Sequence, residues 1–340
     1  MIRKIQILSH GVKHAEDVSV RKIKTMIFDD EGLNDEFKEF VKRNNELNFQ
    51  WYASNIPNFH SIKVIGGRIV YEAGDSTSIE ALGFLSLVRN RANSLKILSD
   101  SRFAGLREII EKNGTFCLTN LYFGLTQNIL GVTKDDEIVL LRRSRQLSEG
   151  PGRYNVFAGF ISSVNEIDGR KVEITDFTKQ AIAELSEESG LNPSEIDVGR
   201  LKLTGLVRCL YNSYLPSLTW VYRFEDLTQD ELLATMKRAK KYDRVNLEHD
   251  SVFFLPLDRI PLLFSGKSLV DKRGVKFDPL ISEDDYSKTG IVDDTIGSIL
   301  SYLRNNNHGI FEEARNALEK RGLVVEVVDI TEGSEKFTFR

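Results

Sequence analysis

The sequence has few cysteines, no long apolar run and no excess of basic residues. Its two cysteines, Cys117 and Cys209, have the spacing of neither a disulfide framework nor a zinc knuckle. No stretch approaches the roughly 18 apolar residues of a membrane-spanning helix. The first residues, Met1 to Gln6, lack the apolar run of a signal peptide. We therefore expect a cytoplasmic protein that has no membrane partner.

Charge and composition narrow the class further. The formal net charge is −4, so the chain lacks the basic footprint of a protein that binds a phosphate backbone, and we expect no nucleic-acid partner. The chain is 41% hydrophobic and 28% charged, which is typical of a globular protein with a buried core. A length of 340 residues predicts two or three structural units.

Hydrophobic periodicity divides the chain into three parts. Residues 1–113 predict a small α/β domain. Residues 114–264 interleave strands with helices, a pattern that predicts a mixed sheet between helical layers. Residues 265–340 predict a helical extension that packs on this core. The expected strands lie at 22–28, 137–142, 155–162, 201–211, 218–224, 251–255 and 323–328, and residues 61–71 are expected as β structure around a turn at Gly66-Gly67. The expected helices lie at 34–47, 78–91, 102–111, 177–189, 228–242, 293–303 and 311–321.

The expected helix near residues 177–189 carries clear start and stop signals. Thr175 or Asp176 can cap its first turn with a side-chain oxygen, and Gly190 suits a left-handed stop. Its apolar stripe consists of Phe177, Ala181 and Leu185.

Carboxylates line the same helix. Residues three and four positions apart share a helix face, so Glu184, Glu187 and Glu188 are expected side by side. Crowded carboxylates favour a hard cation with oxygen preference, and this pattern predicts Mg²⁺ or Mn²⁺. We expect Glu188 to be a surface carboxylate whose replacement by Gln changes the unfolding temperature little.

This stretch resembles the second half of the Nudix box, G-x5-E-x7-R-E-U-x-E-E-x-G-U, in which U is a bulky aliphatic residue. Ala183 stands where the box has Arg. We interpret Gly159 as the first glycine, followed by an inserted loop; Gly169 has the regular spacing, but Thr175 then falls where the first Glu belongs. Either Glu166 or Glu173 can stand in for that Glu. The matching positions are Glu184, Leu185, Glu187, Glu188, Gly190 and Leu191.

Within the Nudix superfamily, the chain is most similar to the hydrolases of UDP-glucose and UDP-galactose. That group has a box without the Arg, a long insertion after the glycine, a separate N-terminal domain and a strand L-R-R-S-R followed by E-x-P-G. The corresponding strings here are Leu141-Arg142-Arg143-Ser144-Arg145 and Glu149-Gly150-Pro151-Gly152, and Glu248-His249-Asp250 also resembles that group. The resemblance covers roughly residues 114 to 256.

The resemblance implies a Nudix-like α/β/α sandwich with a mixed sheet, preceded by a smaller α/β N-terminal domain. It implies metal-dependent hydrolysis of the diphosphate bond of a nucleoside diphosphate derivative, in particular a UDP-sugar that gives UMP and sugar 1-phosphate. The alternative is a catalytically silent Nudix-shaped module with a nucleotide-binding or regulatory role. The missing Arg favours the module, whereas the intact Glu184-x-x-Glu187-Glu188 favours the hydrolase.

The expected metal ligands are Glu184 and Glu188, with Glu187 as a further ligand or as the base that orients water. By resemblance, the Gly159 carbonyl lies close enough to coordinate. Glu248 is a candidate ligand or base from a later loop, with an exposed loop acid as the alternative.

Arginines are the expected phosphate ligands, because a planar guanidinium can bind a phosphate bidentately. Arg143 and Arg145 share one face of their strand and Arg142 lies on the other. Tyr154 is the candidate for stacking on a nucleobase, with a place in the core as its alternative, and we interpret His249 as a structural or surface residue.

Overall fold

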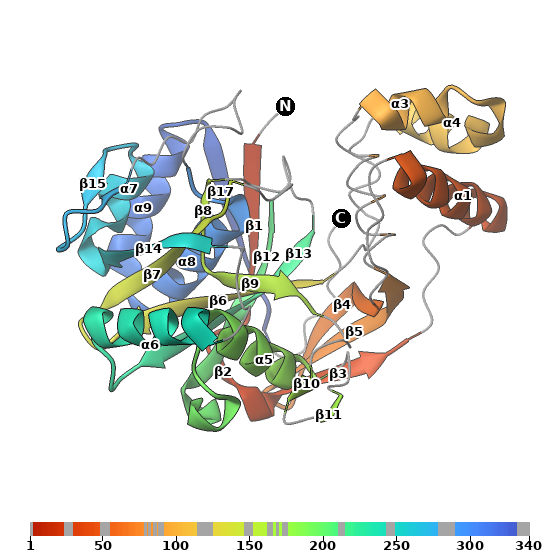
Figure 1. Cartoon of the computed structure of the whole chain (residues 1–340). Coiled ribbons are helices and arrows are strands. Elements are labelled where there is room, and N and C mark those ends of the chain that lie inside the picture. Colours follow the sequence, from red (N-terminus) through yellow and green to blue (C-terminus); the bar gives the residue numbers. More distant parts are fainter. Residues whose placement is uncertain are drawn as a thin grey trace.

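The computed structural model shows a mixed α/β protein with a large mixed sheet and a separate small one (Figure 1). It describes residues 3–23, 30–47, 55–77, 80, 83, 87, 92–113, 125–145, 152–161, 166–167, 170–171, 176–209, 215–242, 249–277 and 290–331. None of the helices in these ranges is long and apolar enough to cross a membrane.

The large sheet has the strand order β14-β7-β6-β13-β12-β1-β17, with β2 on β12, β8 on β7 and β9 on β6. The pairs β6–β13 and β1–β17 are parallel and the others are antiparallel. Its strands are β1 (Arg3–Ser9), β2 (Lys13–His14), β6 (Thr126–Thr133), β7 (Glu137–Arg143), β8 (Tyr154–Asn155), β9 (Phe157–Phe160), β12 (Leu201–Cys209), β13 (Pro216–Phe224), β14 (His249–Pro256) and β17 (Leu323–Asp329).

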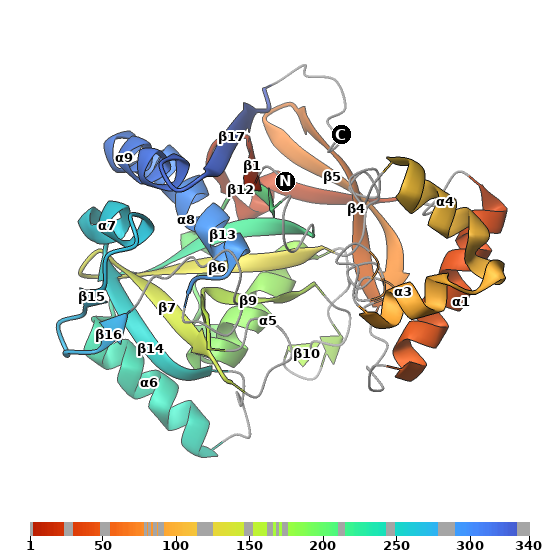
Figure 2. The same cartoon turned by 90° about the horizontal axis from the view of Figure 1, so that it is seen from above.

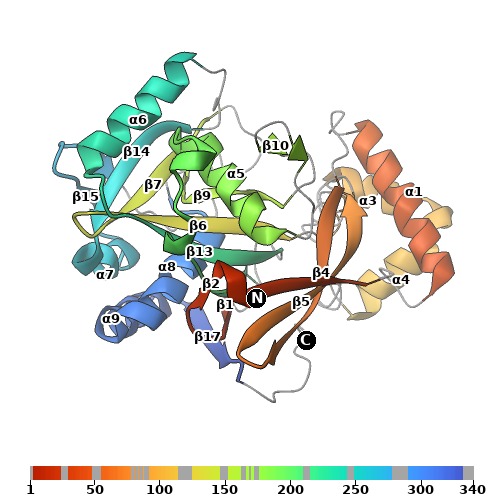
Figure 3. The same cartoon turned by 90° about the horizontal axis from the view of Figure 1, so that it is seen from below.

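Helices cover both faces of this sheet (Figure 3). Helices α5 (Phe177–Ser189) and α6 (Gln229–Tyr242) lie on one face, and α7 (Ile260–Phe264), α8 (Asp293–Asn306) and α9 (His308–Glu319) lie on the other. Side chains of a strand alternate between faces: Val139 and Leu141 of β7 join the core under α5, whereas Ile138 and Leu140 join the core under α8. The large sheet is therefore the middle layer of three.

The small sheet has the order β3-β5-β4, with strands β3 (Val18–Lys22), β4 (Asn55–Ile65) and β5 (Arg68–Thr77). Gly66 and Gly67 form the tight turn between β4 and β5, with φ values of 57° and 75° that glycine adopts without strain. Ile62, Ile69 and Tyr71 extend the core under α5, and the Tyr71 ring lies 5.7 Å from that of Phe177. The small sheet thus braces the first turn of α5.

Three helices continue beyond the small sheet, as Figure 2 shows from above. They are α1 (Glu31–Leu47), α3 (Ala92–Leu98) and α4 (Ala104–Asn113), with the 3₁₀ turn η2 (Ser101–Phe103) before α4. Buried Phe40 contacts Phe37 and Phe103 with ring centroids 6.4 and 6.3 Å apart. The Glu36 carboxylate accepts the Leu106 N–H at 2.9 Å, which caps α4 from α1.

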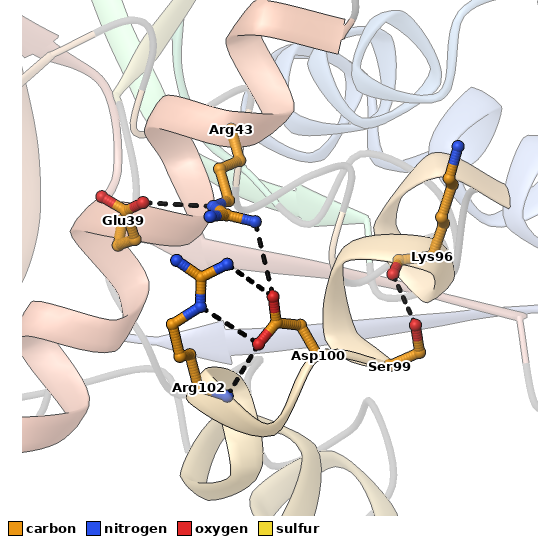
Figure 4. A network of polar contacts seen from close by, with 6 residues as sticks. All are labelled: Glu39, Arg43, Lys96, Ser99, Asp100 and Arg102. Atoms are coloured by element: carbon orange, nitrogen blue, oxygen red, sulfur yellow. Dashed lines mark hydrogen bonds and ion pairs between the residues drawn. The ribbon is translucent and has the colours of Figure 1, made fainter.

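A polar network centred on Asp100 also joins these helices (Figure 4). Asp100 accepts the Arg102 N–H at 3.0 Å and forms ion pairs with Arg102 at 2.6 Å and Arg43 at 3.5 Å. Hydrogen bonds from the Arg102 side chain hold the pKa of the Asp100 carboxyl below its usual range. Arg43 in turn bonds Glu39 on the preceding turn of α1 at 3.1 Å.

Short strands and 3₁₀ turns lie between the larger elements in the described part of the chain. They are the strands β10 (Glu166–Ile167), β11 (Arg170–Lys171), β15 (Leu269–Val270) and β16 (Lys276–Phe277) and the 3₁₀ turns η1 (Ala15–Asp17), η4 (Pro193–Glu195), η5 (Val198–Arg200) and η6 (Leu257–Arg259).

Most expected elements are confirmed, including the hairpin of β12 and β13. The single strand expected at 155–162 is instead two, because β8 pairs with β7 whereas β9 pairs with β6. β3 ends at Lys22, where the strand expected at 22–28 begins, and residues 24–29 lie outside the described ranges. In the expected helix at 78–91, Glu80, Gly83 and Leu87 are helical, and the other residues are not described.

The large sheet combines strands from all three expected parts of the chain. β1 comes from the N-terminal part and pairs with β12 of the central part, and β17 comes from the C-terminal part and pairs with β1. The C-terminal part therefore supplies a strand as well as helices. The division at residues 113 and 264 stays a prediction.

His10 links the two sheets at the end of β1. It is 8% exposed, its Nδ1–H donates to the Gly11 carbonyl at 2.8 Å, and its Nε2 lies 3.3 Å from the Tyr71 hydroxyl. Burial disfavours the charged imidazolium and lowers the pKa of His10 from its usual 6.5 to about 4.

Acidification is predicted to destabilise the fold through His10. Between pH 6.5 and about 4 the unfolded chain binds a proton at His10 that the folded chain does not, so the free energy of unfolding falls as pH falls. The expected loss is about 3 kcal/mol. Urea unfolding at pH 7 and pH 4.5 should show a flatter pH dependence for His10→Gln than for the wild type. The control His14→Gln, at an exposed position, should keep the wild-type slope; equal slopes for His10→Gln and the wild type contradict the prediction.

Candidate functional site

Helix α5 forms as its sequence predicts. The Asp176 side chain accepts the Lys179 N–H at 3.0 Å and caps the start, and Gly190 ends the helix at φ 75°. Phe177, Ala181 and Leu185 are at most 2% exposed, so the apolar stripe faces the sheet. This packing brings the last turns of α5 over β9 and beside β14.

A side chain of β6 fixes the helix from below. Gln127 is fully buried, and its Nε2 donates to the Gln180 carbonyl at 2.9 Å. Gln127 lies opposite Gly159 in the β6–β9 pair, so both residues face α5. Its Oε1 accepts no hydrogen bond within the described part of the chain.

Glu184 lies directly against the backbone of β9 at Gly159. A Cβ atom at this position would be 2.5 and 2.7 Å from the two carboxylate oxygens of Glu184. Such distances are far shorter than van der Waals contact. The Glu184 carboxylate therefore occupies the space of a side chain at this position, and any larger residue would have to displace it.

Glu188 reaches the same strand one helical turn later. Its Oε2 accepts the Ala158 N–H at 2.9 Å, and its Oε1 lies 3.5 Å from Nδ1 of His249, with both side chains 3% exposed. The expectation of a surface carboxylate is therefore wrong: the end of α5 is enclosed by β9 and β14. Consecutive helix residues lie roughly 100° apart, so Glu187 is turned to the exposed side.

The arginines lie where β7 ends. Arg143 is opposite His249 in the β7–β14 pair and follows Val139 and Leu141 in alternation, so it is on the face of α5. Arg142 is on the other face, with its Nε 3.9 Å from Asp250 Oδ1. Arg145 is exposed beyond the strand. The register thus brings Arg143, but not Arg142, to the side of the carboxylates.

Tyr154 is not brought to the carboxylates. It is 3% exposed and belongs to the core under α8, where its ring lies 4.2 Å from that of Phe277 and 6.1 Å from that of Phe253. This burial raises the pKa of Tyr154. Phe157 and Trp220 are core residues on the α5 side.

Three other candidate acids are not among the residues described so far at this site. Glu173 and Glu248 lie outside the described residues, and Glu166 is in β10, where it pairs with Lys171. The choice between Glu166 and Glu173 therefore stays open.

The site offers oxygen donors of the kind that a hard cation binds. Glu184 and Glu188 reach adjacent residues of β9, Gly159 and Ala158. Within the described ranges, no group of three or more Asp, Glu, His or Cys side chains forms a metal cage. Mg²⁺ commonly uses one or two carboxylates and fills its other positions with water and substrate phosphates. Two carboxylates are thus compatible with the donor set that Mg²⁺ uses.

Comparison with solved structures shows a similarity of fold over part of the chain. No family model matches the sequence, and no curated protein matches it. The crystal structure of DR0079 from Deinococcus radiodurans is 12% identical, covers 41% of this chain and 71% of that chain, and has a TM-score of 0.27. The crystal structure of the MutT protein from Methanosarcina mazei Go1 is 16% identical, covers 40% of this chain and 79% of that chain, and has a TM-score of 0.26. At these TM-scores the similarity assigns no residue and no reaction.

We interpreted His249 as a structural or surface residue, and the structure buries it beside Glu188, with 5% of the residue exposed. The register shifts between His249 and Ser251, and this bulge sets which residue of β14 faces α5. The string Glu248-His249-Asp250 resembles the UDP-sugar hydrolases and could have drawn attention to this segment. Only the bulge shows that the histidine of this string lies on the side of α5.

The contacts of Glu188 predict graded effects on stability. Glu188→Ala removes the acceptor of the Ala158 N–H and the contact with His249, so we expect a loss of about 1–3 kcal/mol in the free energy of unfolding. Glu188→Gln keeps an acceptor oxygen of the same reach and should cost less. Glu187→Ala, the exposed neighbour, should change stability by about 0.5 kcal/mol or less. Urea unfolding measures all three, and equal effects of Glu188→Ala and Glu187→Ala contradict the described packing.

Proposed function

We propose that this protein hydrolyses the diphosphate bond of a nucleoside diphosphate derivative with the help of Mg²⁺ or Mn²⁺. The observation that supports this most is the placement of Glu184 and Glu188, one turn apart on α5, against Gly159 and Ala158 of β9. The same carboxylates and the same glycine carry the sequence resemblance to the Nudix box.

Glu184 and Glu188 would hold the cation, with the Gly159 carbonyl, Glu187 and Glu248 as further candidate oxygen donors. A bound Mg²⁺ supplies charge neutralisation on the phosphoryl oxygens and lowers the pKa of a water molecule. Glu187, exposed on the same helix, is the candidate base that takes the proton of the attacking water.

Arg143 is the candidate phosphate ligand on this face, and Arg145, exposed beyond the end of β7, is a second candidate. A guanidinium donates two parallel N–H bonds to phosphate oxygens and keeps its charge at all physiological pH values. It can therefore orient the diphosphate for attack. In the reaction, the water oxygen bonds to one phosphorus and the bridging P–O bond breaks, so the second phosphate leaves with the bridging oxygen.

The proposed substrate is a UDP-sugar, with UMP and sugar 1-phosphate as products. The support comes from four sequence features together: the L-R-R-S-R strand, the Glu149-x-Pro151-Gly152 turn, the insertion after Gly159 and the box without its Arg. The small sheet packs beside α5 through Tyr71 and Phe177. An additional unit at this place suits a substrate with two bulky ends, because such ligands are held between units of structure.

A second candidate function is a silent module that binds a nucleotide without cleaving it. Two observations favour it. Ala183, where the Nudix box has Arg, has no polar side-chain atom, and both Glu188 oxygens already contact groups of the protein, the Ala158 N–H and His249.

A substrate panel separates these functions. Purified full-length protein with Mg²⁺ is predicted to cleave UDP-glucose faster than ADP-ribose or a nucleoside triphosphate, with phosphate release after phosphatase coupling as the readout. Faster cleavage of ADP-ribose or the triphosphate discards the UDP-sugar and keeps the hydrolase. Tight binding of one nucleotide by calorimetry without any cleavage identifies the silent module.

Gly159→Ala tests the carboxylate site without disturbing the core. The added methyl would displace the end of the flexible Glu184 side chain, so activity should fall by at least about 100-fold, as it does when a reacting group is misplaced, while the unfolding temperature changes little. Gly309→Ala is a matched control, because its Cβ meets only Asn307 Oδ1 at 3.7 Å; it should keep full activity.

The outcome that contradicts this prediction is a Gly159→Ala enzyme with wild-type turnover. Gly131→Ala is a second comparison variant, for which we expect a change in stability. A Cβ there would lie 2.7 Å from the Phe157 ring and 2.8 Å from the Phe224 ring, so this variant should lose stability.

A further inference from the structure

His249 contacts the candidate site from a different element than the carboxylates. It begins β14, whereas Glu184 and Glu188 belong to α5. Its Nδ1 lies 3.5 Å from Glu188 Oε1, and both side chains are 3% exposed. A buried carboxylate is costly unless its oxygens contact donors or positive groups. The Ala158 N–H donates to Oε2 of Glu188 at 2.9 Å, and Nδ1 of His249 approaches Oε1, a contact that becomes an ion pair when the imidazole is protonated.

The backbone of β14 is shaped so that His249 faces this carboxylate. Val252 pairs with Leu141 and Ser251 with Arg142, but the residue opposite Arg143 is His249 and not Asp250. One extra residue is therefore inserted, and bulges of this kind turn a chosen side chain toward a site. Without it, Asp250 would lie opposite Arg143 and would add a further negative charge beside Glu188.

The two contacts of Glu188 come from two different strands. Ala158 belongs to β9 and is held by the pairing of β9 with β6, in which Ala158 is opposite Asn128. His249 is held by the pairing of β14 with β7. Glu188 therefore has one oxygen tied to each of two strands, and its carboxylate cannot rotate without losing a contact.

We propose that His249 is a positioning residue that sets the orientation of the Glu188 carboxylate for binding the divalent cation. This inference rests on the proposed function, because it assigns Glu188 to the cation site. Partners that orient a metal-binding side chain contribute to affinity through that ligand, and their loss typically weakens metal binding 10- to 100-fold.

The test compares wild type, His249→Leu, His249→Gln and the exposed control His308→Gln, whose side chain is 64% exposed. The affinity for Mn²⁺ alone is measured from the electron paramagnetic resonance signal of the free ion. His249→Leu should weaken Mn²⁺ binding by at least about 10-fold. His249→Gln keeps an N–H donor and should recover most of the affinity, and His308→Gln should equal wild type.

A kinetic readout separates positioning from general damage. His249→Leu should need at least about 10-fold more Mn²⁺ for half-maximal turnover, while kcat at saturating Mn²⁺ recovers toward wild type. A merely structural lesion lowers turnover at every Mn²⁺ concentration, and that result overturns the proposal. Wild-type Mn²⁺ affinity in His249→Leu also overturns it.

A double-mutant cycle of His249→Leu and Glu188→Gln, followed by urea unfolding, tests the contact without metal or substrate. Non-additive effects are expected, because the two side chains touch, and additive effects overturn the proposal. If the wild type binds no Mn²⁺ and cleaves none of the nucleotides, the proposed function fails first and the positioning role fails with it. The wild-type measurement itself distinguishes this outcome from a failure of the positioning role alone.

Discussion

The docking of α5 on the large sheet is the constraint on which the candidate site depends. Phe177, Ala181 and Leu185 bury one stripe of the helix, and full burial of a Phe or Leu side chain contributes about 1.5–3 kcal/mol. Once this stripe is seated, the helix cannot rotate, and Glu184 and Glu188 are held against β9. The chemistry of the site is thus set by apolar packing on the neighbouring face of the same helix.

Segments far apart in the sequence hold that docking in place. The small sheet, formed by residues before 78, contacts the first turn of α5 through Tyr71. β6 fixes the middle turn through Gln127, and β14 contacts the last turn through His249. The first, middle and last turns of the helix therefore each have a partner from another part of the chain.

Burying the pair of Glu188 and His249 costs desolvation free energy, so the pair contributes little to the stability of the fold. Removing two ionisable groups from water offsets much of their attraction, and apolar residues of similar size often give a more stable core. A buried carboxylate that accepts the Ala158 N–H and a histidine presented by a bulge are easier to understand as a site than as a stability element. This reasoning links the energetic cost of the arrangement to the proposed binding of a cation and a diphosphate.

The sequence by itself determined the helix of residues 177–189, its caps and its buried stripe, because these follow from periodicity and capping chemistry. It also predicted that Arg142 and Arg143 face opposite ways, since strand residues alternate. Only the tertiary structure decided that Glu188 is buried, that Tyr154 lies in the core under α8 and that His249 contacts Glu188. These facts depend on a bulge and on strand pairings between distant segments, which a local pattern does not encode.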